Sequence, residues 1–166
     1  VRSIHHALNK RNFIRHAKAI VIGGGNTFAL LKKMQEEDLL DMIFRRVKAG
    51  VPYIGWSAGS NVTCPTICTT NDMPIVQPQS FRAIGLVPFQ INPHYLDETR
   101  EQRINEYLEA NRSRYVVGLR EGCMLRVTES SIELIGSRPM RIFKKGIETY
   151  EVNPGDNIEF LIKRTK

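Results

Sequence analysis

Two short apolar segments of this chain each run straight into a glycine-containing turn. Residues 18–22 precede a turn at 23–27, and residues 51–54 precede a turn at 55–59. Between them, apolar residues recur at helical spacing from Phe28 onward. A strand, a turn and a helix in succession build a parallel sheet, because parallel strands need a crossover connection. The sequence therefore predicts an α/β fold, with a mostly parallel sheet and helices on both faces.

The rest of the chain continues this pattern and then changes to shorter strands. Asp38 is predicted to cap a second helix that ends at Gly50. A third strand is predicted at 84–91 and a charged helix at 98–110. Further strands are predicted at 115–119, 124–128, 131–135, 141–143 and 158–162. The last four predict an antiparallel edge to the sheet, so that residues 1–166 form one domain.

Residues 55–59, Gly-Trp-Ser-Ala-Gly, have the pattern of a nucleophile elbow. In such a turn the serine leaves the strand with its hydroxyl exposed, and the flanking glycines keep neighbouring side chains away. Short serine and glycine turns also occur without any catalytic role. The position directly after a strand favours the catalytic interpretation, with Ser57 as nucleophile.

A serine nucleophile needs a base, and the base needs an orienting carboxylate. His94 is the candidate base, because it follows a strand and an Asn-Pro pair, whereas the other histidines lie upstream of the first glycine turn. The carboxylate is either Glu121, at a predicted strand end, or Asp72, in the long irregular segment 65–78. The spacing of these residues in the sequence does not decide between the two carboxylates.

Backbone amides would stabilise the oxyanion of an acyl-transfer reaction. Gly24 and Gly25 of the first turn are candidates for one donor, and Ala58, directly after the nucleophile, for the other. The alternative, a phosphate-binding loop, is disfavoured because the first turn lacks the usual glycine spacing and a following Gly-Lys pair.

The composition limits which partners, cofactors and cellular settings fit this chain. The net charge of +7 comes from scattered Lys and Arg residues, which predicts solvated faces and no nucleic-acid partner, while favouring a small anionic substrate. Three cysteines without a zinc-like pattern predict no metal, no cofactor and a reducing, cytoplasmic setting. The sequence has neither a membrane-spanning run nor the apolar core of a signal peptide.

Five motifs, in order along the chain, resemble the peptidase E family of α-aspartyl dipeptidases. They are Ile-Gly-Gly-Gly-Asn-Thr-Phe at 22–28, Gly-Trp-Ser-Ala-Gly-Ser-Asn at 55–61, Thr-Thr-Asn-Asp-Met-Pro-Ile-Val at 69–76, Gln-Ile-Asn-Pro-His at 90–94 and Glu-Thr-Arg-Glu-Gln-Arg at 98–103. The resemblance covers residues 18–125. Five motifs in register are much more specific than the elbow alone.

The resemblance implies a fold like that of class I glutamine amidotransferases and a Ser-His-Glu triad that cleaves dipeptides with an N-terminal aspartate. Its members would be Ser57, His94 and Glu121, with Asp72 in support. Arg100 is the candidate to bind the aspartate side chain, because a guanidinium meets a carboxylate with two parallel hydrogen bonds. Candidates for binding the free amino group are Asn61 and Glu98.

The chain also departs from the family pattern in two places. The family has a further strand and helix before the first glycine turn, and a glycine-bearing loop between His94 and the motif at 98–103. We therefore also consider a truncated, weakly active or inactive homologue that binds a ligand or partner. A homodimer is the candidate assembly. A related enzyme that cleaves β-aspartyl bonds is disfavoured by the Asn-Asp-Met-Pro motif.

Overall fold

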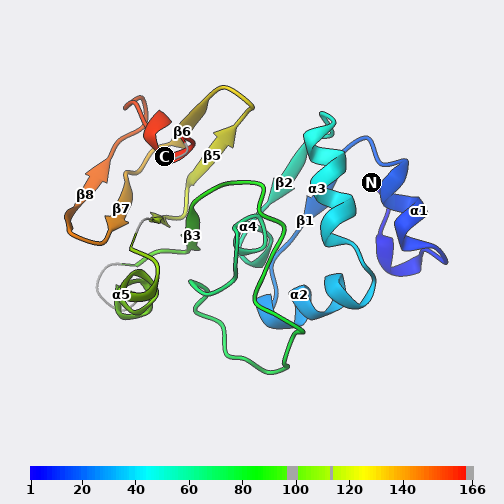
Figure 1. Ribbon diagram of the computed structural model, residues 1–166. Coiled ribbons are helices and arrows are strands. Elements are labelled where there is room, and N and C mark those ends of the chain that lie inside the picture. Colours follow the sequence, from blue (N-terminus) through cyan, green and yellow to red (C-terminus); the bar gives the residue numbers. More distant parts are fainter. Residues whose placement is uncertain (97–100, 113, 164–166) are drawn as a thin grey trace. The chain divides into compact units, whose positions relative to one another are not determined.

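The computed structural model describes residues 1–96, 101–112 and 114–163, which fall into two compact units. The first unit consists of Val1–Ile67 and Asp72–Leu86, and the second of Cys68–Asn71 and Val87–Lys166. Figure 1 shows the helices of the first unit in blue and cyan, and the antiparallel strands of the second in yellow and orange.

The first unit contains the two predicted strand, turn and helix segments. Its elements are η1 (Ile4–His6), α1 (Lys10–Arg15), β1 (Ile20–Ile22), α2 (Thr27–Glu36), α3 (Leu40–Lys48), β2 (Tyr53–Gly55) and α4 (Ala58–Asn61). Strands β1 and β2 pair in parallel, with Ile20 opposite Tyr53 and Ile22 opposite Gly55. Both glycine turns therefore leave the sheet at the carboxyl ends of adjacent strands.

Helices α2 and α3 supply most of the core of the first unit. Helix α2 buries Phe28, Leu31 and Met34 on one face, and α3 buries Ile43. This spacing of three residues is the helical pattern that the sequence predicted. The predicted break between the two helices is confirmed.

The predicted cap of the second helix is wrong. Leu39 occupies the N-cap position of α3, and no side-chain hydrogen bond caps the helix. Asp38 instead has a positive φ of 52° and pairs with Arg11 at 3.2 Å. Because its backbone is left-handed, Asp38 turns the chain between the helices rather than starting one of them.

The second unit is built on a four-stranded sheet of order β3-β4-β7-β8, with a separate hairpin of β5 and β6. Its elements are β3 (Gln90–Pro93), α5 (Glu101–Ala110), β4 (Tyr115–Leu119), β5 (Cys123–Val127), β6 (Ile132–Gly136), β7 (Met140–Lys144), β8 (Ile147–Val152) and η2 (Glu159–Leu161). Strands β3 and β4 are parallel, whereas β4 with β7 and β7 with β8 are antiparallel. The predicted antiparallel edge is thus present.

Three segments differ from the strands that the sequence pattern predicts. The apolar segment 84–91 is a strand only from Gln90, because Gly85 and Pro88 interrupt the earlier part. Residues 158–162 form the 3-10 helix η2, whose Ile158 and Leu161 are buried three positions apart. Strand β8 is not predicted by alternation, because its apolar residues Ile147, Tyr150 and Val152 are not all two positions apart.

Tyr95 belongs to a buried hydrophobic cluster of the second unit. The other members are Ile104, Tyr107 and Leu108 of α5 and Val116 and Phe143 of the sheet, and the rings of Tyr95 and Phe143 meet edge to face. A Cβ added at Gly118 of β4 would lie 2.7 Å from this ring, so a side chain at that position would displace Tyr95. Across the ranges that the structure describes, no helix is both long and apolar enough to cross a membrane.

Candidate active site

Ser57 is held in a strained backbone conformation directly after β2. Its φ is 55° and its ψ is −119°, a combination that L-residues rarely adopt. Strain of this kind costs about 1–3 kcal/mol and is typical of functional turns. The side chain is only partly buried, and α4 begins at the next residue. Ser57 therefore has the strand, sharp turn and helix geometry of a nucleophile elbow.

The two glycines of the elbow are required by close packing. A Cβ at Gly59 would lie 2.0 Å from the carbonyl oxygen of Ile22, and a Cβ at Gly55 would lie 2.7 Å from that of Gly59. The backbone N–H of Gly59 donates to Gly23 at 3.2 Å, and the hydroxyl of Tyr53 donates to the carbonyl of Gly59 at 2.7 Å. The elbow is thus fastened to both β1 and β2.

The first glycine turn lies against the elbow. A Cβ at Gly24 would be 3.5 Å from Ser57 Oγ, and Gly25 has a φ of 134°, which favours glycine. Ala58 is the first residue of α4, where backbone N–H groups lack helical partners. These positions agree with the predicted oxyanion donors Gly24, Gly25 and Ala58, whose role stays a prediction.

Asp72 and Asn61 both contact Thr27, the first residue of α2. Asp72 Oδ2 accepts hydrogen bonds from the Thr27 backbone at 2.7 Å and from its hydroxyl at 2.6 Å. Asn61 is buried, and its side-chain amide donates to Thr27 Oγ1 at 3.4 Å. Through these contacts both residues hold the start of α2, next to the glycine turn.

His94 and Glu121 lie side by side because β3 and β4 are parallel and adjacent. Pro93 is opposite Leu119 in the register, so the residues that follow the two strands meet at one end of the sheet. His94 Nδ1 is 3.0 Å from Glu121 Oε1, and His94 has a φ of 53°. The side chains are 44% and 76% exposed, respectively, so that the pair is open to solvent.

This contact bears on the chemistry that His94 offers. An ionised carboxylate only accepts hydrogen bonds, so a neutral imidazole in this contact would carry its proton on Nδ1 and present Nε2 as an acceptor. A histidine in this tautomer can remove a proton from a hydroxyl group. Ser57 belongs to the first unit, whereas His94 and Glu121 belong to the second.

Two predicted substrate ligands, Arg100 and Glu98, lie outside the described residues. Sequence pattern assigns no role to Thr27 and Tyr53, although Thr27 binds Asp72 and Asn61 and Tyr53 binds the carbonyl of Gly59. Threonine at a helix start and tyrosine in a strand are too common to single out by pattern. Within the described ranges, no group of three His, Cys, Asp or Glu residues is arranged to hold a metal ion.

Comparisons with known proteins find relatives named peptidase E. A protein from Nostoc sp. named peptidase E is 52% identical over 98% of this chain and 70% of its own length. One of the same name from Streptomyces coelicolor is 43% identical over the same shares.

Among solved structures, a Listeria monocytogenes EGD-e protein provisionally assigned to peptidase E matches with a TM-score of 0.63 and 25% identity. A peptidase from an acI-B1 Actinobacterium matches with a TM-score of 0.67 and 18% identity, which supports the fold. The matches cover 77% and 89% of this chain, but only 64% and 62% of the two solved chains. The profile of peptidase family S51 matches residues 2–135, and the chain belongs to this family.

Proposed function

We propose that this protein is a serine dipeptidase that hydrolyses dipeptides with an N-terminal aspartate. The observation that carries the proposal is the strained backbone of Ser57, at a φ of 55° in a residue other than glycine. Such strain persists only where the surrounding structure enforces it, and here the Gly55 and Gly59 contacts do so. Relatives that bear the name peptidase E support peptidase activity. The preference for an N-terminal aspartate is what the resemblance of the five motifs implies.

In the proposed reaction, Ser57 Oγ attacks the peptide carbonyl while His94 Nε2 accepts the hydroxyl proton. The carbonyl oxygen becomes an oxyanion, which the backbone N–H groups of Ala58 and of Gly24 or Gly25 would stabilise. The peptide C–N bond then breaks, and His94 donates the proton to the leaving amino group. An aspartyl ester of Ser57 remains.

Hydrolysis of this ester completes the cycle. His94 Nε2 removes a proton from water, which attacks the ester carbonyl, and the proton then returns to Ser57 Oγ as free aspartate leaves. Throughout, the Glu121 carboxylate would keep the imidazole oriented and stabilise its positive charge. The 3.0 Å contact between the two side chains supports this role.

Substrate selection is proposed to rest on three polar or charged side chains, those of Arg100, Glu98 and Asn61. Arg100 is proposed to bind the aspartate side chain with two parallel hydrogen bonds. Glu98 or Asn61 is proposed to bind the free amino group. The positive net charge of +7 would favour the approach of an anionic dipeptide.

The test is an assay of the purified protein on Asp-Leu, Leu-Asp and β-linked Asp-Leu. We expect release of aspartate from Asp-Leu alone. Ser57→Ala is expected to lower kcat by about three orders of magnitude or more while the protein stays folded. Equal activity of Ser57→Ala would refute the mechanism. Binding of Asp-Leu without cleavage would favour the alternative, a catalytically inactive homologue.

A further inference from the structure

The exposed pair of His94 and Glu121 has two buried neighbours along the chain. Tyr95 follows His94 and is 1% exposed, and Arg120 precedes Glu121 with a side chain that is 8% exposed. The guanidinium of Arg120 lies over the Tyr95 ring, 5.2 Å from its centre.

Arg120 is also held by hydrogen bonds on its other side. Its two terminal nitrogens donate to both carboxylate oxygens of Glu151, at 2.6 and 2.9 Å. One of them also donates to the carbonyl of Pro139 at 2.8 Å. A planar guanidinium bound in this two-pronged way has one orientation, which lysine cannot reproduce.

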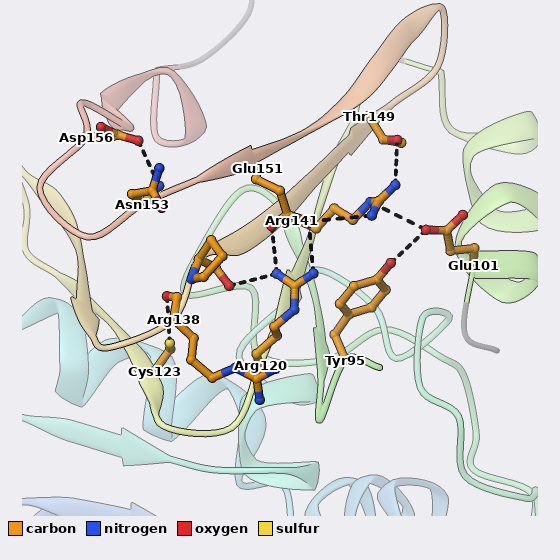
Figure 2. A network of polar contacts seen from close by, with 11 residues as sticks. Tyr95, Glu101, Arg120, Cys123, Arg138, Arg141, Thr149, Glu151, Asn153 and Asp156 are labelled. Atoms are coloured by element: carbon orange, nitrogen blue, oxygen red, sulfur yellow. Dashed lines mark hydrogen bonds and ion pairs between the residues drawn. The ribbon is translucent and has the colours of Figure 1, made fainter. Parts of the chain in front are cut away.

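These contacts continue into a closed ring of five side chains (Figure 2). The Tyr95 hydroxyl donates to Glu101 Oε1 at 2.7 Å, and Glu101 pairs with Arg141 at 3.5 Å. Arg141 pairs in turn with Glu151 at 3.5 Å, and Glu151 holds Arg120. The ring connects the ends of β3 and β4 with β7, β8 and the first residue of α5.

The His94–Glu121 contact needs such external support. Both side chains are open to water, and exposed ion pairs contribute little by themselves to holding a geometry. A buried charge such as Arg120, in contrast, is costly unless every partner is in place, so its network tolerates few arrangements. The stack of Arg120 on Tyr95 therefore fixes the backbone on both sides of the exposed pair.

We propose that Arg120 is a positioning residue, which sets the distance between Glu121 and His94. It does so through its stacking on the Tyr95 ring and its two hydrogen bonds to Glu151. The expected effect on activity rests on the proposed function, in which the pair acts in catalysis. The expected effect on the geometry of the pair concerns the substrate-free protein and does not depend on that function. We expect changes at Arg120 to alter the hydrogen bond at His94 Nδ1 without touching the pair itself.

The experiment compares Arg120→Lys and Arg120→Met with matched changes at Arg126. Arg126 pairs with Glu133 across the β5–β6 hairpin of the same unit, and both are exposed, so it is the control for loss of an ion pair. Nitrogen-15 NMR of the substrate-free, neutral His94 ring reports which nitrogen carries the proton. Kinetics with Asp-Leu report kcat and KM separately.

In the parent and in the Arg126 variants we expect the Nδ1–H tautomer to predominate. In the Arg120 variants we expect a mixture of tautomers and a fall in kcat of at least about tenfold, with KM changed less than kcat, because the reacting groups lose their alignment. The loss should be smaller in Arg120→Lys, which keeps the charge opposite Glu151.

Folded Arg120 variants with the parent tautomer and parent kcat would overturn the inference. Circular dichroism identifies the folded variants, and Arg120→Lys decides the question if Arg120→Met unfolds. The tautomer is measured without substrate, so its outcome is separate from that of Ser57→Ala. An inactive parent whose Nδ1–H tautomer is lost in Arg120→Lys would refute the proposed function and support the positioning role.

Discussion

Asp72 Oδ2 accepts two hydrogen bonds from Thr27, one from its backbone N–H at 2.7 Å and one from its hydroxyl at 2.6 Å. The carboxylate thus lies at the N-terminus of α2, where the helix dipole favours a negative charge. The side-chain amide of Asn26 donates to the carbonyl of Met73 at 2.8 Å, which ties the same two segments together. The Asn-Asp-Met-Pro segment therefore fixes the end of the glycine turn.

Asp72→Asn should loosen this turn. We expect the free energy of unfolding to fall by about 1–2 kcal/mol, because a charged acceptor at a helix N-terminus is replaced by a neutral one. Denaturant titration measures the change. Asp156→Asn is the control, since Asp156 accepts one backbone hydrogen bond, from Asn153, in an exposed turn. An effect no larger than that of the control would contradict the supporting role of Asp72.

Glu121→Gln should lower kcat without destabilising the protein. The amide keeps an acceptor for His94 but loses the charge that stabilises the imidazolium, so a fall in kcat of about 10²- to 10⁴-fold is expected. Stability should change little, because the pair is exposed. Glu133→Gln, at another exposed ion pair, is the control. Parent activity in Glu121→Gln would show that this carboxylate has no catalytic part.

Gly59→Ala should disrupt the elbow. The new methyl group would lie 2.0 Å from the Ile22 carbonyl oxygen, so β1 and the elbow must move apart, at an expected cost of about 3 kcal/mol. Thermal unfolding and activity should both decrease. At Gly155, with a φ of 94° and open space around it, alanine adds backbone strain alone, about 1 kcal/mol. Similar losses at the two positions would contradict the close packing of the elbow.

Tyr53→Phe should change how stability depends on pH. Burial, and secondarily the nearby Cys64, raises the pKa of the Tyr53 hydroxyl above its usual value of 10.0. The unfolded chain then releases this proton first, so the parent loses stability as pH rises past about 10. Phenylalanine cannot ionise and lacks this loss, although it costs about 1 kcal/mol at neutral pH through the missing bond to Gly59.

Unfolding by denaturant at about pH 8 and pH 11 checks this prediction, since the stability difference between parent and Tyr53→Phe should shrink or reverse at the higher pH. Tyr150→Phe is the control. Burial also raises the pKa of Tyr150, but its side chain is 40% exposed, and a smaller effect is expected. A difference that is constant with pH would show that Tyr53 does not titrate as its burial requires.

Local sequence pattern is sufficient to predict the parts of the site that are formed by consecutive residues. The apolar run before Ser57, the flanking glycines and the helical spacing after Thr27 predicted two strand, turn and helix segments, and the structure confirms them. These features follow from backbone sterics and side-chain periodicity, which act over a few residues. For the same reason, Gly85 and Pro88 limit the strand within 84–91 to its end, from Gln90.

Sequence pattern is therefore enough to predict the elbow and the candidate residues, including both Glu121 and Asp72 as possible partners of a histidine. What each carboxylate contacts depends on the packing of the folded chain. The register of β3 and β4 brings Glu121 to His94 across 27 residues of chain, and Asp72 reaches Thr27 across 45. Strand order and register arise from burial of the whole sheet, so no local pattern encodes them. The burial of Arg120 against Tyr95 follows from the same packing.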